Sequence, residues 1–229
     1  MSFGPDLKLT FSRSHIIRLG FLPYVRDVII RPELLRAAIQ FWDPKVHVFH
    51  FGFSELCPSV EEFHAYLGGF DVEVPVNPFE KIEIAQTLSE KLGISKNASK
   101  SLTEGRALNI PHLINQFRGN RFALCLCLLA TFLLLQPDGQ ASSLLVSVAA
   151  QIDDHKDVSP MVLAETLMGL DAMYDGQTNV FGGSPLFLQL WLCDKLNLLE
   201  PIPRNLVHET WGFIRRDFVV VYEREELWV

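Results

Sequence analysis

Four groups of residues in this sequence have side chains that could do chemistry, and the spacing within each group decides which chemistry is possible. The first is Cys125-x-Cys127. Two residues apart on a helix means roughly 200° around the helix axis, so these thiols cannot bind one metal ion there. No second cysteine pair follows at the spacing of a zinc site. Because free cysteine behaves as a small hydrophobe, we interpret the pair as part of a core.

His47 and His50 form the second group. They lie in KVHVFHFGFSEL (45–56), where β-branched and aromatic residues predict an extended segment or a small hairpin. On a strand the two rings point to opposite faces, because the side-chain period is two. Metal binding would therefore need partners from elsewhere, such as Glu61 or His64, and a structural role is the simpler interpretation.

The third group, DDHKD (153–157), lacks the glycine and the final glutamate of a calcium loop, so we interpret it as a solvated connection between helices. The fourth, Gly182-Gly183-Ser184, precedes a helix but has neither the lysine nor the spacing of a phosphate-binding loop. A helix cap with a turn explains it. No serine lies in a nucleophile motif. The sequence therefore predicts no catalytic residue, no cofactor site and no metal site.

The element that must organise the rest is the apolar stretch 121–152. From Phe122 to Leu135 almost nothing is polar, 137–139 (Pro-Asp-Gly) predicts a turn, and a second apolar run follows. A helix that is apolar on every side must be surrounded by protein or by lipid. This run is shorter than the roughly 20 residues that cross a bilayer. The stretch therefore predicts a buried hairpin of two helices.

Further helices are expected around this hairpin. Pro32 suits the first position of a helix whose apolar face reaches Trp42 and which ends at Asp43-Pro44. Ser59 and Glu62 form a capping box. The segment 93–104 predicts a flexible loop, or a short helix and then a loop. The remaining helices are predicted over 80–92, 110–117, 159–174, 186–199 and 205–213, with Ser159 as the N-cap of its helix.

The predicted fold class is mainly α, as a single compact multi-helix domain over 1–229. A short β element is expected near 45–56, and 218–222 is a second β-prone run. Residues 1–14 and 223–229 are expected to be loose ends.

Charge is distributed unevenly along the chain. Residues 1–121 hold 14 Lys and Arg against 13 Asp and Glu, so +1, whereas 122–229 hold 6 against 14, so −8. An acidic C-terminal half argues against a large nucleic-acid face there. Hydrophobic residues make up 48%, which is too high for a disordered chain. Four cysteines, without a signal pattern or a membrane span, predict an intracellular, reducing location in the nucleus or cytosol.

Four segments, in order, resemble the aminotransferase-like plant mobile domain family of transposable elements. In 34–76 the shared features are a tryptophan, an aromatic strand, and the pattern P-[ST]-x-E-[ED] leading into a helix. Asn109-Ile110-Pro111, followed by Leu113 and Phe117, is the second segment. The third is the buried pair at 121–152, and the fourth is LAETL (163–167) with FGGSPLFLQLWLCDKL (181–196). GGF at 68–70 departs from the Leu-Gly-Leu of many members.

The family name suggests an aminotransferase, which we do not expect here. Such an enzyme needs a lysine Schiff base and a large α/β fold, and this sequence lacks the alternating βα pattern. The resemblance instead implies a mostly helical, nuclear module of transposon origin. It implies action through protein partners in transposon silencing and gene expression.

Three hypotheses follow. The first is a non-catalytic interaction module in the nucleus. The second is an enzyme whose site is assembled from distant residues such as His47, His50 and Asp154. The third is a nucleic-acid-binding domain that uses basic residues of the N-terminal half, namely Arg13, Arg18, Arg26, Lys91, Lys96, Lys100, Arg118 and Arg121.

Overall fold

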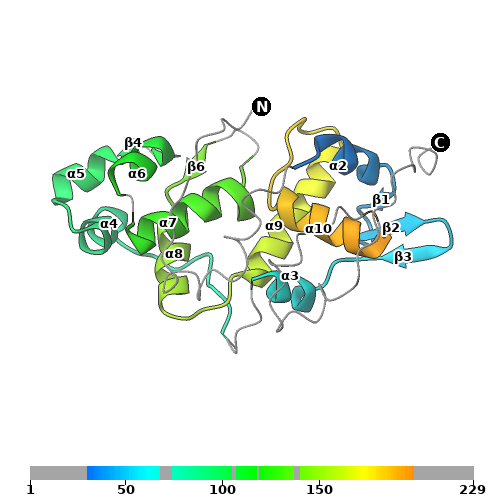
Figure 1. Ribbon diagram of the computed structural model, residues 1–229, viewed down its shortest axis with the longest axis horizontal. Coiled ribbons are helices and arrows are strands. Elements are labelled where there is room, and N and C mark those ends of the chain that lie inside the picture. The colour runs from blue at the N-terminus through cyan, green and yellow to red at the C-terminus, as the bar shows by residue number, and fades with distance from the viewer. Residues whose placement is uncertain are drawn as a thin grey trace.

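The computed structural model describes residues 30–67, 74–104, 107–117, 119–136, 140–196 and 198. This part of the chain is mainly α, which confirms the predicted class at that level, and it contains two small antiparallel sheets. Among the described residues, no helix combines the length and apolarity that crossing a membrane requires. The elements form two groups along the long axis of the molecule (Figure 1).

The first group, on the left in Figure 1, holds mostly short helices around a three-stranded sheet ordered β4-β5-β6. Its helices are α4 (Ile84–Leu92), α5 (Lys96–Ser101), α6 (Ile110–Gln116), α7 (Arg121–Leu128) and α8 (Leu145–Asp153). Its strands are β4 (Thr103–Glu104), β5 (Ala107–Leu108) and β6 (Ala141–Ser142). Segment 93–104 thus contains the short helix of the second prediction, but it ends in strand β4 and not in a loop.

The second group, on the right, holds the two longest described helices, α9 (Ser159–Tyr174) and α10 (Pro185–Leu196), and a sheet ordered β1-β2-β3. Its other helices are α2 (Pro32–Ile39) and α3 (Val60–Tyr66). Its strands are β1 (Trp42–Asp43), β2 (Val48–Phe51) and β3 (Ser54–Leu56). The predicted β element at 45–56 is thus a hairpin, which β1 extends.

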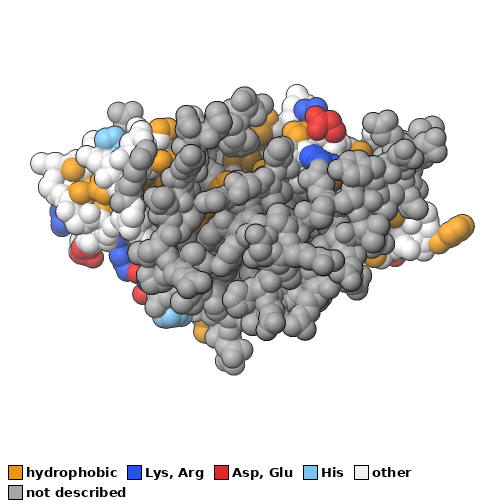
Figure 2. All heavy atoms as spheres, viewed as in Figure 1, with side chains coloured by type: hydrophobic (Ala, Val, Ile, Leu, Met, Phe, Trp, Pro, Cys, Tyr) orange, Lys and Arg blue, Asp and Glu red, His pale blue; other side chains and the backbone are white. Residues whose placement is uncertain are grey.

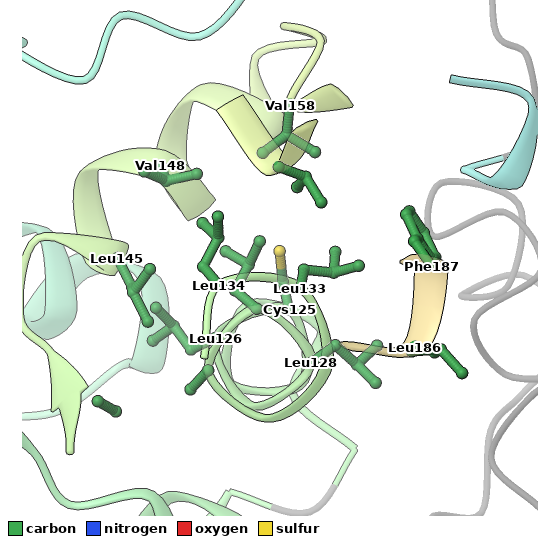
Figure 3. Packing of buried hydrophobic residues seen from close by; sticks show 14 of the residues in the cluster. Cys125, Leu126, Leu128, Leu133, Leu134, Leu145, Val148, Val158, Leu186 and Phe187 are labelled. Carbon is green, nitrogen blue, oxygen red and sulfur yellow. The ribbon is translucent and has the colours of Figure 1, made fainter. Parts of the chain in front are cut away.

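The predicted apolar spine joins the two groups. After α7 the chain continues as a π-helix, η2 (Leu129–Leu133), and α8 returns beside it. α7 packs on α4, α6 and α8, whereas η2 packs on α8 and α10. In Figure 3, Leu126 and Leu134 lie on the side of α8, and Leu128 lies on the side of α10. All three are buried, so the prediction that 122–135 is helical and enclosed by protein is confirmed through Leu133.

The Gly182–Ser184 turn is an internal packing device and not a phosphate loop. A Cβ on Gly183, whose φ is +82°, would lie 2.5 Å from Thr166 Cα. Ser184 is fully buried, and its hydroxyl donates to Phe132 O over 2.8 Å. That carbonyl lies in η2, where the helix widens. Ser184 Oγ also accepts from Phe187 N over 3.2 Å, so the predicted cap of α10 is present.

Two predicted helix ends were wrong. The first helix ends at Ile39 and not at Asp43, because Trp42 pairs with Phe49 in the sheet. At α9 the cap is not the side chain of Ser159. Asp157 Oδ1 accepts instead from Ser159 N over 2.8 Å. The predictions for 1–14, 68–70, 137–139, 205–213, 218–222 and 223–229 lie outside the described residues.

Candidate functional site

The β1-β2-β3 sheet has one aromatic face and one polar face, because side chains alternate along each strand. On the aromatic face Phe49 is fully buried, with its ring centroid 4.8 Å from Trp42 and 5.6 Å from Trp191 of α10. Phe51 stacks on Phe49 at 5.6 Å. This face fixes the sheet to the helices, so the opposite face and the free edges are the parts that can meet another molecule.

His50 lies at the centre of the polar face. Its Nε2 is 3.7 Å from Asp43 Oδ2, and its Nδ1 is 3.6 Å from Glu55 Oε1. The two carboxylates therefore approach opposite nitrogens of one ring. Since one metal ion can take only one nitrogen of a ring, these three residues do not form a chelating set. Within the described ranges, no group of three His, Cys, Asp or Glu side chains is placed to hold a metal ion.

His47 lies in the turn between β1 and β2 and contacts α9. Its backbone is left-handed, with φ +55°, a conformation that a non-glycine residue adopts at some cost. Its ring stacks on Trp42, and its Nε2 lies 3.1 Å from Asp171 Oδ2. Asp171 Oδ1 accepts from Trp42 Nε1 over 2.8 Å. One carboxylate thus fixes both rings, and this sheet turn is held rigidly on the helix.

The β2–β3 hairpin projects from the molecule. Gly52 (φ +62°) takes the first central position of its two-residue turn, where type II′ turns favour glycine. Phe53, the second central residue, is fully exposed. The hairpin reaches the right-hand end of the molecule in Figure 1, and Figure 2 shows hydrophobic atoms projecting there. An aromatic ring surrounded by water in this way is a candidate contact for a partner.

Sequence reasoning missed the residues that matter most at this site, Phe53, Glu55 and Asp171. Gly52 between alternating aromatic residues was a hairpin signal that could have pointed to Phe53. Nothing local marks Asp171, because its contacts to Trp42 and His47 span more than a hundred residues of chain.

The basic residues proposed for nucleic acid are only partly available. Arg121 Nη2 contacts Asp153 Oδ1, and Lys91 Nζ donates to Asp153 Oδ2 over 2.7 Å. Lys96 and Lys100 are exposed, one turn apart on α5. The other four candidates, Arg13, Arg18, Arg26 and Arg118, lie outside the described residues. Hydrogen bonding from Lys91 lowers the pKa of Asp153, so the carboxylate stays charged and keeps both cations.

A Ser–His–Asp group that the sequence analysis did not consider occurs between α3 and α9. His64 Nδ1 lies 3.2 Å from Asp157 Oδ2 and 3.3 Å from Ser159 Oγ. In a catalytic triad the serine and the aspartate contact opposite ring nitrogens, whereas here they share one. Ser159 is also fully buried, and its N–H and hydroxyl both donate to Asp157. The group caps α9 and is not a nucleophile.

The three residues suggested for an assembled active site are not brought together. His47 lies in the β1–β2 turn and His50 on β2, both in the second group, whereas Asp154 follows α8 in the first (Figure 1). Within 153–157, His155 is left-handed (φ +62°), and its N–H donates to Ile152 O over 3.1 Å. Residues 153–155 therefore end α8, whereas Asp157 caps α9.

The two cysteines of α7 are packing residues. Cys125 and Cys127 are buried on α7, and burial raises the pKa of Cys125 to about 12 and that of Cys127 to about 11. Thiolate is the form that binds metals and attacks electrophiles, so both thiols are unreactive at neutral pH. This placement agrees with their interpretation as core residues.

Residues 4–212 match the family model described as a domain of unknown function, DUF7745, and the chain belongs to this family. The match carries no link to the plant mobile domain, so that resemblance stays a prediction. No curated protein and no solved structure matches the chain.

Proposed function

We propose that this domain is a non-catalytic interaction module that acts in the nucleus through protein partners. The observation that carries the proposal is Phe53, which is fully exposed at the tip of a hairpin whose other aromatic side chains anchor it to the core. Phenylalanine, tyrosine and tryptophan are enriched at protein interfaces and depleted from free surface. A ring held out on a short, rigid hairpin loses little conformational entropy when it docks.

The polar clusters support the same proposal, because their functional groups already serve the fold. Asp171 holds Trp42 and His47, and Asp153 holds Lys91 and Arg121. Glu62 Oε2 accepts from Trp191 Nε1 over 2.8 Å and completes the predicted capping box with Ser59. Each of these carboxylates links two or more elements, as residues that stabilise the fold do. The nuclear location and the transposon origin rest on the sequence resemblance alone.

The test compares two exposed phenylalanines. Phe53 and Phe79 are both exposed in loops, Phe53 in the second group of elements and Phe79 just before α4. The tagged chain, Phe53→Ser and Phe79→Ser are each cross-linked in nuclear extract, and the captured proteins are quantified. We expect the wild type and Phe79→Ser to recover the same partner, and Phe53→Ser to recover at least about tenfold less. Equal recovery by all three would contradict this surface as the interface.

Catalysis is the competing class. Turnover of a nucleotide, nucleic acid or peptide by the purified chain, abolished by a point substitution that leaves the fold intact, would overturn the non-catalytic proposal. Fusion of the chain to a fluorescent protein tests its location, and exclusion from the nucleus would contradict that part.

A second candidate function, nucleic-acid binding, is favoured by α5. Lys96 and Lys100 lie four residues apart on this helix, so their side chains are neighbours on one surface. Both are exposed, and within the described part of the chain neither has a carboxylate partner. Two adjacent cations could contact successive phosphates.

Salt dependence tests this candidate. If both lysines contact duplex DNA, the slope of log K against log salt includes about −1.8 from them. The double variant Lys96→Glu, Lys100→Glu would lose that part of the slope, whereas Lys81→Glu, at another exposed lysine, would keep it. No binding of DNA or RNA at low salt would exclude the candidate.

A further inference from the structure

The register of the β2–β3 hairpin decides where the backbone of β3 points. Phe51 and Ser54 flank the two-residue turn and are the first hydrogen-bonded pair of the hairpin. The next pair, His50 and Glu55, is therefore a non-hydrogen-bonded pair. The backbone of His50 agrees with this assignment. Its N–H donates to Phe41 O over 2.8 Å and so points away from β3. The N–H and C=O of Glu55 consequently point outward from the sheet.

β3 is the last strand of this sheet, in the order β1-β2-β3, and within the described residues no further strand pairs with its outer side. Glu55 thus offers one donor and one acceptor at a sheet edge, which is the geometry to which an extended chain can add. Phe53 lies two residues before Glu55 and is fully exposed. A chain that added to this edge would run past the ring and cover part of it.

From this geometry we propose that the outer edge of β3 is a docking site for an extended peptide segment that carries lysine or arginine opposite Glu55 and an apolar residue beside Phe53. The proposal rests on the proposed function and names the kind of partner. The charge of this edge favours a basic peptide. Glu55 is exposed, and a second carboxylate, Asp43, lies on the other side of its cross-strand neighbour His50. Opposite charges on adjacent strands attract, whereas like charges directly opposite repel.

A second copy of this chain fits the edge less well. In a two-fold symmetric dimer, the β3 edges of two copies would pair about Glu55, the residue whose backbone points outward. The two Glu55 side chains would then lie opposite each other on the same face of the joined sheet. That arrangement opposes like charges at the centre of the contact. A basic segment of a different protein removes this repulsion and replaces it with an attraction.

The experiment titrates the full ¹⁵N-labelled chain with three synthetic, end-capped hexapeptides. One alternates arginine and valine, the second has glutamate in place of arginine, and the third is the basic peptide with proline at the positions that would donate to the edge. We expect the basic peptide to shift the amide signals of Ser54–Leu56 and to bind about fivefold more tightly than the acidic peptide. The proline peptide should not bind, because it lacks the N–H donors.

Substitutions in the protein make the test specific. Glu55→Lys should reverse the preference between the acidic and the basic peptide, and Glu55→Gln should remove it. Phe53→Ala should weaken the binding of both peptides about equally. Glu83→Lys changes an exposed carboxylate at the start of α4, in the other group of elements, and should leave the preference unchanged. The amide spectrum of each variant verifies that the chain remains folded.

Several results would overturn the proposal. These are shifts confined to other residues, equal binding of the basic and acidic peptides, or an unchanged preference in Glu55→Lys. A Glu55 amide that exchanges slowly with D₂O in the free chain would show that another segment already covers the edge. A dimer whose formation shifts the amide signals of Ser54–Leu56 in the absence of peptide would identify a second copy as the occupant. If the peptides fail while Phe53→Ser still loses its partner in nuclear extract, the edge is wrong and the interaction module stands.

Discussion

At the scale of single residues, two glycines allow the chain before α10 to approach α9 closely. Gly169 allows Gly182 O to touch α9, since a Cβ at 169 would lie 2.3 Å from that oxygen. A Cβ at Gly183 would lie 2.5 Å from Thr166 Cα on the same helix. Gly183, from the glycine pair that resembles a ligand loop in the sequence, and Gly169 on α9 therefore allow the chain before α10 to pack against α9.

Gly183→Ala should destabilise the fold strongly. Its φ of +82° is unfavourable for alanine, and the new methyl would overlap the backbone of Thr166. We expect the free energy of unfolding to fall by about 3 kcal/mol. Gly176→Ala is the matched control, with φ +68° and open space around its Cβ, and it should cost only about 1 kcal/mol. Urea unfolding measures both, and equal losses would show that the contact with Thr166 is unimportant.

The four thiols should differ in reactivity. Cys57 is exposed, although partial desolvation raises the pKa of its thiol as well. Burial raises the pKa of Cys125 to about 12 and that of Cys193 to about 11. Because thiolate is the reactive form, a maleimide at pH 7 should label Cys57 first and the other three only after unfolding. Mass spectrometry of the labelled chain counts the sites. Labelling of Cys125 or Cys127 in the native chain at the rate of Cys57 would contradict the burial of α7.

At the scale of elements, a few half-buried carboxylates connect helices that also pack on one another. Asp153, at the end of α8, contacts Lys91 of α4 and Arg121 of α7. Glu62 on α3 similarly reaches Trp191 and Lys195 on α10. These contacts fix the relative positions of the elements in each group.

Asp153→Asn should lower the free energy of unfolding by about 1–2 kcal/mol at pH 7, because two cations lose their charged partner. The pKa of Asp153 is lowered in the folded chain, so its contribution is complete above the unfolded value of about 3.9. It is lost as the pH falls through the lower folded value. The difference between variant and wild type should therefore shrink in strong acid.

Asp175→Asn is the control for this prediction. Asp175 is exposed at the end of α9, and its side chain accepts from Gln177 two residues later. A change within about 0.5 kcal/mol is expected there, as for most surface sites. Urea unfolding from pH 7 down to pH 2 checks both variants. A difference for Asp153→Asn that stays constant over this range would contradict the role of its charge.

Local chemistry made several elements predictable from sequence. The Ser59–Glu62 capping box is present on both sides, and Pro32 begins α2 as its ring geometry favours. Trp42 is a residue for which prediction from local sequence was wrong. Its spacing fits the apolar face of the helix, but pairing with Phe49 and the bond to Asp171 place it in a strand. Contacts between distant residues decided the outcome there, and a local pattern does not contain them.

At the scale of the whole molecule, apolar periodicity predicted the mainly α class, and the lack of polar residues after Arg121 predicted the buried run there. The candidate site could not be found in this way. It is defined by exposure, by the free side of an edge strand and by a carboxylate, Asp171, brought from α9. None of these three properties leaves a periodic signal, and the most visible polar motifs, such as Gly182–Ser184, turned out to serve packing.

The affinity of the first partner recovered from nuclear extract, measured for the purified wild type and for Phe53→Ser, tests the central claim most directly. If the exposed hairpin tip is the contact, the variant should bind at least about tenfold more weakly while its unfolding temperature is unchanged, since the ring makes no contribution to the core. Equal affinities of the two proteins would contradict the claim that this surface is the interface.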